Sequence, residues 1–159
     1  MGQVQHQLMA CQLYGDTILQ FVITMVLRQK YPLLTPGSTT VRPPAVYFCY
    51  ALTEMQELRI RLVRNRTLAA ISKHFGLPSH LRANPAQKSM LQASSRTQAA
   101  ILEAYVCTLY DEQGLDMVWA LVNRCFVPIA EAEYLALQHE RVRSSASSAQ
   151  LKLTEKAGA

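Results

Sequence analysis

The apolar residues of this chain recur at helical spacing over most of its length. From Gln7 to Lys30 they fall three and four residues apart, which predicts an amphipathic helix. The clearest of these positions are Ile18, Phe21, Val22, Met25 and Val26. Pro32 and Pro36 end this helix, and residues 32–44 are expected to form a loop. A second helix is predicted from about Ala45 to Val63.

A shorter helix is predicted next, from Thr67 to Phe75. Gly76 follows it directly, and a glycine just past the last apolar position is the usual left-handed stop of a helix. Residues 77–94 are polar and contain Pro78 and Pro85, so this stretch is expected to be broken rather than continuously helical.

The last third of the chain predicts three helices divided by one glycine and one proline. A strong helix is expected from about Ser95 to Tyr110, ending at Gly114. Two more are expected near 115–125 and 128–139, separated at Pro128. Because no strand-like alternation and no internal repeat occur, the predicted fold class is all-α.

Length and composition indicate one globular domain. A chain of 159 residues with 50% hydrophobic and 17% charged residues can bury a core and is not expected to be disordered. Residues 1–139 are assigned to this domain. Residues 140–159 are rich in serine, alanine and charge, so they are expected to form a flexible C-terminal tail.

The net charge of +5 permits an anionic partner such as RNA without demanding one. The best candidate for phosphate binding is the run Arg59, Arg61, Arg64 and Arg66. On a helix Arg61 and Arg64 share one face, and Arg59 and Arg66 share another, so the charges are split. A solvated helix face is the alternative interpretation of this run.

The four cysteines show no CxxC or Cys/His spacing, so no zinc site is expected and buried thiols are the default interpretation. No signal peptide is recognisable. The longest apolar stretch, Ile18–Leu27, is interrupted by Gln20 and is too short to span a membrane. The expected location is intracellular, in the cytoplasm or nucleus, with the mitochondrion as an alternative and no membrane partner.

Two motifs far apart in the chain carry the chemical information. The first is Gln12-Leu13-Tyr14-Gly15-Asp16-Thr17-Ile18-Leu19, and the second is the segment Ala100–Gly114, which contains Leu102-Glu103-Ala104-Tyr105. They resemble the two active-site helices of ribonuclease III domains. Two further blocks, 58–69 and 75–82, stand between them in the family's order. The resemblance covers roughly residues 8–137 and implies a ribonuclease III-like helical domain.

The resemblance implies metal-assisted hydrolysis of RNA phosphodiesters by two pairs of carboxylates, each pair on one helical face. The corresponding positions here are Gln12, Asp16, Ala100 and Glu103, so two of the four carboxylates are absent. Asp16 and Glu103 are the candidate catalytic residues and metal ligands, with Mg²⁺ binding weakened. The alternative is structural, with Asp16 bonded to a neighbour and Glu103 paired with a surface arginine.

The resemblance also bears on assembly. Family members have about two helices before the first motif, whereas only Met1–Gln7 precede it here. We expect either apolar surface left for a partner or a natural chain that begins further upstream. Family domains usually form two-fold dimers through the first motif, which makes Cys11, Leu13 and Tyr14 candidate interface residues. Core packing is the competing explanation for Leu13 and Tyr14.

Three functions follow from these features, and whether the chain is an enzyme stays open. The first is a degenerate ribonuclease III-like protein that binds structured RNA or a ribonucleoprotein without standard double-stranded RNA cleavage. The second is a metal-dependent endonuclease with a reduced carboxylate set. The third is a small-molecule enzyme of the dehydratase or cyclase type, in which Asp16, Glu103, Tyr14 or Tyr105 would transfer protons.

Overall fold

The computed structural model describes residues 2–32 and 45–157, with side chains described for 10–32 and 53–144. The elements are α1 (Gly2–Lys30), α2 (Ala45–Val63), α3 (Asn65–His74), the 3-10 helix η2 (Leu77–His80), α4 (Pro85–Ala93) and α5 (Ser95–Ala157). All regular elements in this described part are helices, so the all-α prediction is confirmed.

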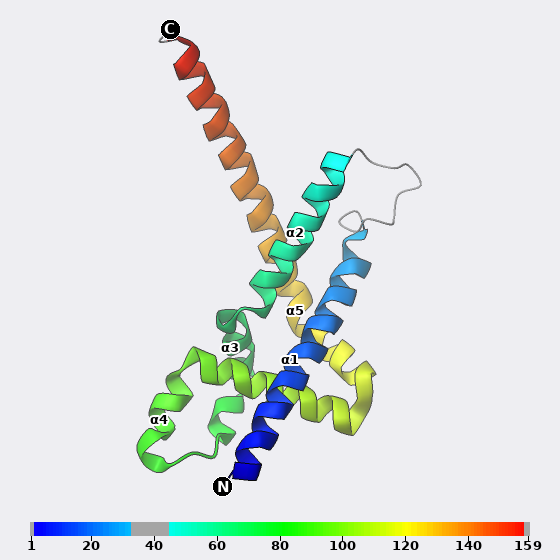
Figure 1. The fold of residues 1–159 in the computed structure, drawn as a ribbon, viewed down its shortest axis with the longest axis vertical. Helices are drawn as coiled ribbons and strands as arrows, with labels where there is room; N and C mark the ends of the chain where they lie inside the picture. The colour runs from blue at the N-terminus through cyan, green and yellow to red at the C-terminus, as the bar shows by residue number, and fades with distance from the viewer. Residues whose placement is uncertain (1, 33–44, 158–159) are drawn as a thin grey trace.

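Helix α5 organises the structure by packing against α1, α2, α3 and α4. Its first part crosses α1, turns at Gly114 and then runs back past α3 and α2 toward the C-terminus (Figure 1). The core lies between these helices. Its fully buried side chains are Leu19, Val22 and Ile23 of α1, Leu58 and Leu62 of α2, Leu68 of α3, and Leu102, Val106, Val118, Val122 and Phe126 of α5.

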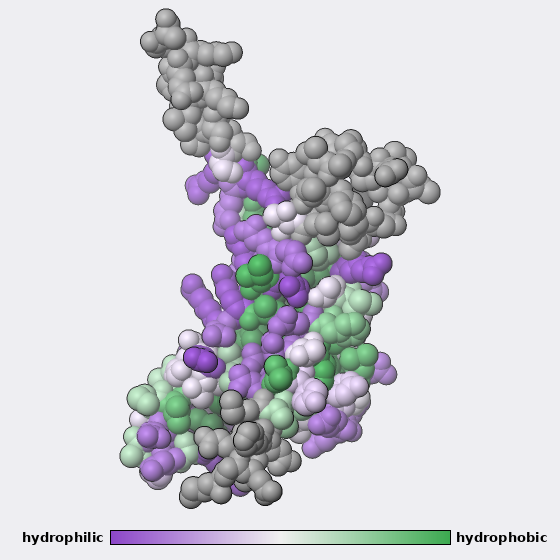
Figure 2. Space-filling view, viewed as in Figure 1, coloured by the Kyte–Doolittle hydropathy of each residue, from purple (hydrophilic) through white to green (hydrophobic). Residues whose placement is uncertain are grey.

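Helix α1 buries only one of its faces. The segment Ala10–Lys30 is long and apolar enough, by length and composition, to cross a membrane, but here one side of it forms part of the core. Its other side exposes four large apolar residues, Leu13, Tyr14, Phe21 and Met25. Hydrophobic residues gather over the middle of α1 and the nearby turn of α5 on the face shown in Figure 2.

The two glycines expected to end helices do so. Gly76 adopts a left-handed conformation with φ 67°, directly after α3 and its C-cap Phe75. Gly114 has φ 78° and ψ −175°, which breaks the helical backbone of α5 and turns the chain. These conformations are open to glycine because it lacks a Cβ atom.

Residues 77–94 are broken as predicted, since η2 ends at His80 and α4 begins only at Pro85. Pro85 occupies the first turn of α4, where its missing N–H loses no helical bond. Asn84 caps this helix by accepting a hydrogen bond from the Ala86 amide. Pro128 lies inside α5, so the expected separation of two helices at this point is wrong. The expected loop at 32–44 lies, apart from Pro32, outside the described residues.

The C-terminal segment continues helix α5 rather than forming a separate irregular tail. The helix extends across the expected boundary at residue 139 and ends at Ala157. Two side chains just beyond that boundary pair with α2: Glu140 with Arg61, at 2.6 Å, and Arg141 with Glu54. Residues 140 and 141 thus belong to the packed body, and the flexibility of the remaining tail stays a prediction.

Candidate functional site

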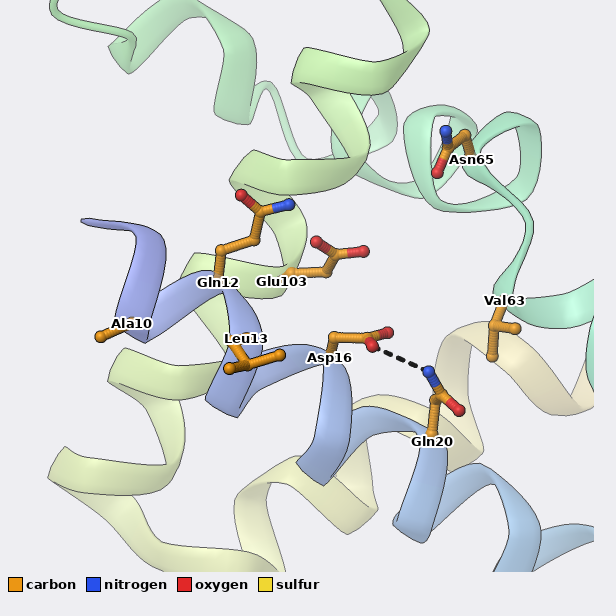
Figure 3. Close-up of a pocket in the computed structure, with 8 residues that line it drawn as sticks. All are labelled: Ala10, Gln12, Leu13, Asp16, Gln20, Val63, Asn65 and Glu103. Carbon is orange, nitrogen blue, oxygen red and sulfur yellow. Dashed lines mark hydrogen bonds between the residues drawn. The ribbon is translucent and has the colours of Figure 1, made fainter. Parts of the chain in front are cut away.

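A cleft of about 730 Å³ opens where the two motif helices cross. Residues of four helices line it: Ala10, Gln12, Leu13, Asp16 and Gln20 of α1, Val63 of α2, Asn65 of α3 and Glu103 of α5. The carboxylates of Asp16 and Glu103 face the same space, with the amide of Gln12 beside Glu103 (Figure 3). The fold therefore brings together the two carboxylates that sequence analysis singled out 87 positions apart.

Gly15 is the reason that these carboxylates meet. A Cβ atom at this position would overlap the carbonyl oxygen of Glu103 and lie 2.6 Å from its carbonyl carbon. It would also stand 3.2 Å from the Cys107 nitrogen. The backbones of α1 and α5 thus touch at Gly15, and only glycine permits this approach. Asp16 is the next residue of α1, so it lies at the edge of this contact between the two helices.

Asp16 is held by an amide side chain one turn further along α1. Gln20 donates a hydrogen bond from Nε2 to Asp16 Oδ2 at 2.8 Å (Figure 3). The Oε1 atom of Gln20 in turn accepts from Arg59 of α2 at 3.4 Å. This chain of contacts fixes one carboxylate oxygen of Asp16 and brings a guanidinium group to the side of the cleft.

Glu103 is nearly buried, with 8% of its surface exposed. Burial raises the pKa of its carboxyl above the usual value, because it penalises the charged form. A hydrogen bond with Gln12 lowers this pKa, and the charge of Asp16 raises it. Glu103 thus holds its proton more firmly than an exposed glutamate, and the Gln12 amide lies beside it (Figure 3).

The described residues do not reproduce a four-carboxylate metal centre. No group of three or more histidine, cysteine, aspartate or glutamate side chains among them could hold a metal ion. Ala100 lies one turn before Glu103 and offers only a methyl group, and Gln12 brings an uncharged amide. Gln20 instead donates a hydrogen bond to Asp16, and the Gln12 amide lies beside Glu103 (Figure 3).

The arginine run is divided between two environments, although it does not lie on one helix as expected: α2 ends at Val63, Arg64 has the extended backbone of the α3 N-cap, and Arg66 lies in α3. Arg61 pairs with Glu57, Glu133 and Glu140, and Arg64 pairs with Glu133 at 2.6 Å. These two arginines tie α2 and the start of α3 to α5. Because their charge is matched by carboxylates, they are poorly placed to bind phosphate.

Arg59 and Arg66 have different surroundings. Arg59 contacts Gln20, which lines the cleft, and Gln56 of its own helix. Arg66 is exposed and directly follows Asn65, another residue of the cleft lining. Of the run, Arg59 thus contacts the cleft lining, and Arg66 is exposed and adjacent in sequence to one of its residues.

The candidate interface residues of α1 lie at the surface of the single chain. Leu13 is 67% exposed and Tyr14 is 64% exposed, while Cys11 is partly exposed. Core packing within this chain thus does not explain Leu13 or Tyr14. Tyr105, a further candidate for proton transfer, is partly exposed and is not among the residues lining the cleft.

The described residues form an all-helical domain in which two carboxylates, Asp16 and Glu103, line one cleft. The ribonuclease III domain model matches residues 10–114, which span both motif helices. The chain belongs to the ribonuclease III domain family.

Several ribonucleases are similar to this chain. It is 29% identical to "Ribonuclease 3" of Mus musculus over 114 residues, which cover 72% of this chain and 7% of that protein. It is 29% identical to "Ribonuclease 3" of Streptococcus thermophilus over 121 residues, covering 74% of this chain and 44% of the relative. For the protein of the same name in Streptococcus agalactiae, the values are 26%, 140 residues, 86% and 51%. This chain spans about half or less of the length of these relatives.

Four residues of the cleft lining were missed by sequence analysis: Ala10, Gln20, Val63 and Asn65. Gln20 could have been found, since it stands four positions after Asp16 on the same helix and such pairs share a face. Val63 and Asn65 carry no such signal, because they reach the cleft only through the packing of α2 and α3 against α1 and α5.

Proposed function

We propose that this chain is a degenerate ribonuclease III-like domain that binds structured RNA without the standard double-stranded RNA cleavage of its family. The observation that carries the proposal is that a carboxamide stands beside each remaining carboxylate. Gln20 donates to Asp16, and the Gln12 amide lies beside Glu103 at one of the two positions, Gln12 and Ala100, where a further carboxylate would complete a metal site (Figure 3). Mg²⁺ would therefore have two carboxylate ligands with competing partners, and weak binding is expected.

RNA binding would use the cleft margin rather than the whole arginine run. Arg59 contacts Gln20 of the cleft lining and Arg66 is exposed, whereas Arg61 and Arg64 are matched by glutamates. The expected contacts are with phosphates, so binding should weaken as salt rises and should show little sequence preference. Replacing Arg66 with Gln should lower the affinity for a structured RNA and reduce the slope of log affinity against log salt by about 1.

A metal-dependent endonuclease with a reduced carboxylate set is the alternative that the shared cleft of Asp16 and Glu103 favours. A small-molecule lyase or cyclase is favoured instead by the raised pKa of Glu103 in a cleft of about 730 Å³, because a protonated carboxyl can act as a general acid. Each alternative makes a different prediction for the same experiment.

The deciding experiment incubates the folded chain with a long double-stranded RNA and Mg²⁺ or Mn²⁺, beside a Glu103→Gln variant. We expect no cleavage by either protein, together with salt-dependent retention of the RNA by both. Metal-dependent cutting that is lost in the variant would overturn the proposal in favour of the nuclease. Absence of both cutting and retention would leave the small-molecule enzyme.

Self-association is proposed through the exposed surface of α1. Leu13 and Tyr14 present apolar area beside the cleft, and a closed two-fold pair is the common arrangement for such a surface. Leu13→Arg should convert a dimer to a monomer when molecular mass is measured in solution. An unchanged mass would argue against this interface.

A further inference from the structure

Two cysteines meet beside the crossing of α1 and α5. Cys11 stands one turn before Gly15 on α1, and Cys107 stands one turn after Glu103 on α5. The Cys11 side chain is close enough to Cys107 to raise the pKa of its thiol. This proximity follows from the backbone contact at Gly15, where an added Cβ would lie 3.2 Å from the Cys107 nitrogen. Disulfides require a close approach of two backbones, which most helix pairs do not provide.

The surroundings give the two thiols different roles. Cys11 is partly exposed, whereas Cys107 is buried. Burial, followed by the neighbouring Cys11 and Asp111, raises the pKa of the Cys107 thiol to about 11. The Sγ atom of Cys107 donates to Asp111 Oδ2 at 3.7 Å. A reagent from solution would therefore meet Cys11 first, and the Cys107 thiol, which holds its proton, would react second.

We propose that Cys11 and Cys107 are a redox pair that forms a reversible intramolecular disulfide on reaction with a small-molecule disulfide such as oxidised glutathione. The Cys11 thiolate attacks one sulfur of the reagent, forming a mixed disulfide and releasing one small thiol. Cys107 then loses its proton to solvent, and its thiolate attacks the Cys11 sulfur, releasing the second small thiol. Two protein thiols are oxidised and one small disulfide is reduced to two thiols.

The disulfide would act on the neighbouring cleft through the helix crossing. It would tie α1 to α5 one turn from both Gly15 and Glu103, so that the two helices could not separate without its reduction. The bond would also close a loop from residue 11 to residue 107, which restricts the unfolded chain. The oxidised protein should therefore unfold at a higher temperature than the reduced one, and reduction should reverse the change.

The test treats the reduced full chain with oxidised glutathione under native conditions, alkylates the remaining thiols and maps the modified peptides by mass. We expect loss of two alkylatable thiols and a peptide pair joined through Cys11 and Cys107. Cys125, which is also partly exposed but has neither of these cysteines as a partner, is the internal comparison. Cys107→Ser should leave glutathione stably attached to Cys11, and Cys11→Ser should leave Cys107 unmodified.

Three results would overturn the proposal. These are a glutathione adduct on Cys11 that persists in the unsubstituted chain, a bond between the Cys11 residues of two copies, and a disulfide that joins either residue to Cys125. The map of the unsubstituted chain decides among these even where a serine variant fails to fold. The readout involves no RNA, so failure of the proposed RNA binding leaves this test unaffected.

Discussion

The Gly15 backbone lies against the carbonyl group of Glu103, and there is no room for a Cβ atom between them. This contact places Asp16 and Glu103 on one cleft and the two thiols of Cys11 and Cys107 beside each other. The geometry of the whole site therefore depends on a residue that carries no functional group.

Gly15→Ala should destabilise the fold by about 3 kcal/mol, because the added methyl group must displace a backbone carbonyl rather than a flexible side chain. In an exposed helix the same change would be stabilising. The free energy of unfolding in urea measures the effect. Gly76→Ala is the matched control, since it faces open space at a positive φ and should lose only about 1 kcal/mol. Equal losses in the two variants would contradict the close helix contact.

Glu103→Gln should raise thermal stability at neutral pH. Its pKa is raised in the folded state, chiefly by burial, so ionisation of Glu103 disfavours folding above that pKa. This penalty disappears as pH falls through the folded-state pKa and the carboxyl becomes protonated. The difference in unfolding temperature between variant and parent should therefore shrink on acidification. Exposed Glu112 on the same helix supplies the control variant Glu112→Gln, for which no such convergence is expected.

Arg61→Ala should destabilise the fold by about 1 to 3 kcal/mol, because it leaves Glu57, Glu133 and Glu140 facing one another without their shared cation. Only 19% of the Arg61 side chain is exposed, so solvent screens the loss incompletely. Urea unfolding measures this loss, and exposed Arg66→Ala is the control expected to change stability by less than about 0.5 kcal/mol. RNA affinity should show the opposite order, with Arg66→Ala weakening RNA binding more than Arg61→Ala does. This outcome would support the separate roles proposed for the two arginines.

The double substitution Gln12→Glu and Ala100→Asp should introduce metal-dependent cleavage of double-stranded RNA. It supplies the two missing carboxylates and removes the amide that bonds Glu103. Gel analysis of the RNA with and without Mg²⁺ is the measurement, and adding Glu103→Gln to the double variant should abolish the gain. A folded double variant that stays inactive would show that the loss of activity has a cause beyond these two positions.

Pro128→Ala should stabilise the protein by about 1 to 3 kcal/mol. Pro128 lies within α5, where a proline cannot donate the helical hydrogen bond to the carbonyl of Arg124. Alanine restores this donor at an exposed position. Urea unfolding measures the gain, and an unchanged or lower stability would mean that the ring of Pro128 makes compensating contacts with its neighbours.

The sequence by itself determined the all-α class, the bounds of α2 and the breaks at Gly76 and Gly114. These features depend on residues close together in the chain: apolar periodicity and the backbone freedom of glycine. The presence of Asp16 and Glu103 in one cleft was also predictable, because both residues lie in motifs that resemble one family. A split of the arginine run was predicted from helical spacing, but in the structure it accompanies the break at Arg64 between α2 and α3.

Only the tertiary structure decided what those residues touch. Packing maintains helix α5 through Pro128 despite the lost hydrogen bond. It also places three glutamates around Arg61: Glu57 on the same helix, and Glu133 and Glu140 on α5. The backbone contact at Gly15 and the meeting of Cys11 with Cys107 depend on how two helices cross. The angle and position at which two helices cross depend on many side-chain contacts between distant segments. The spacing of residues within one segment does not predict them.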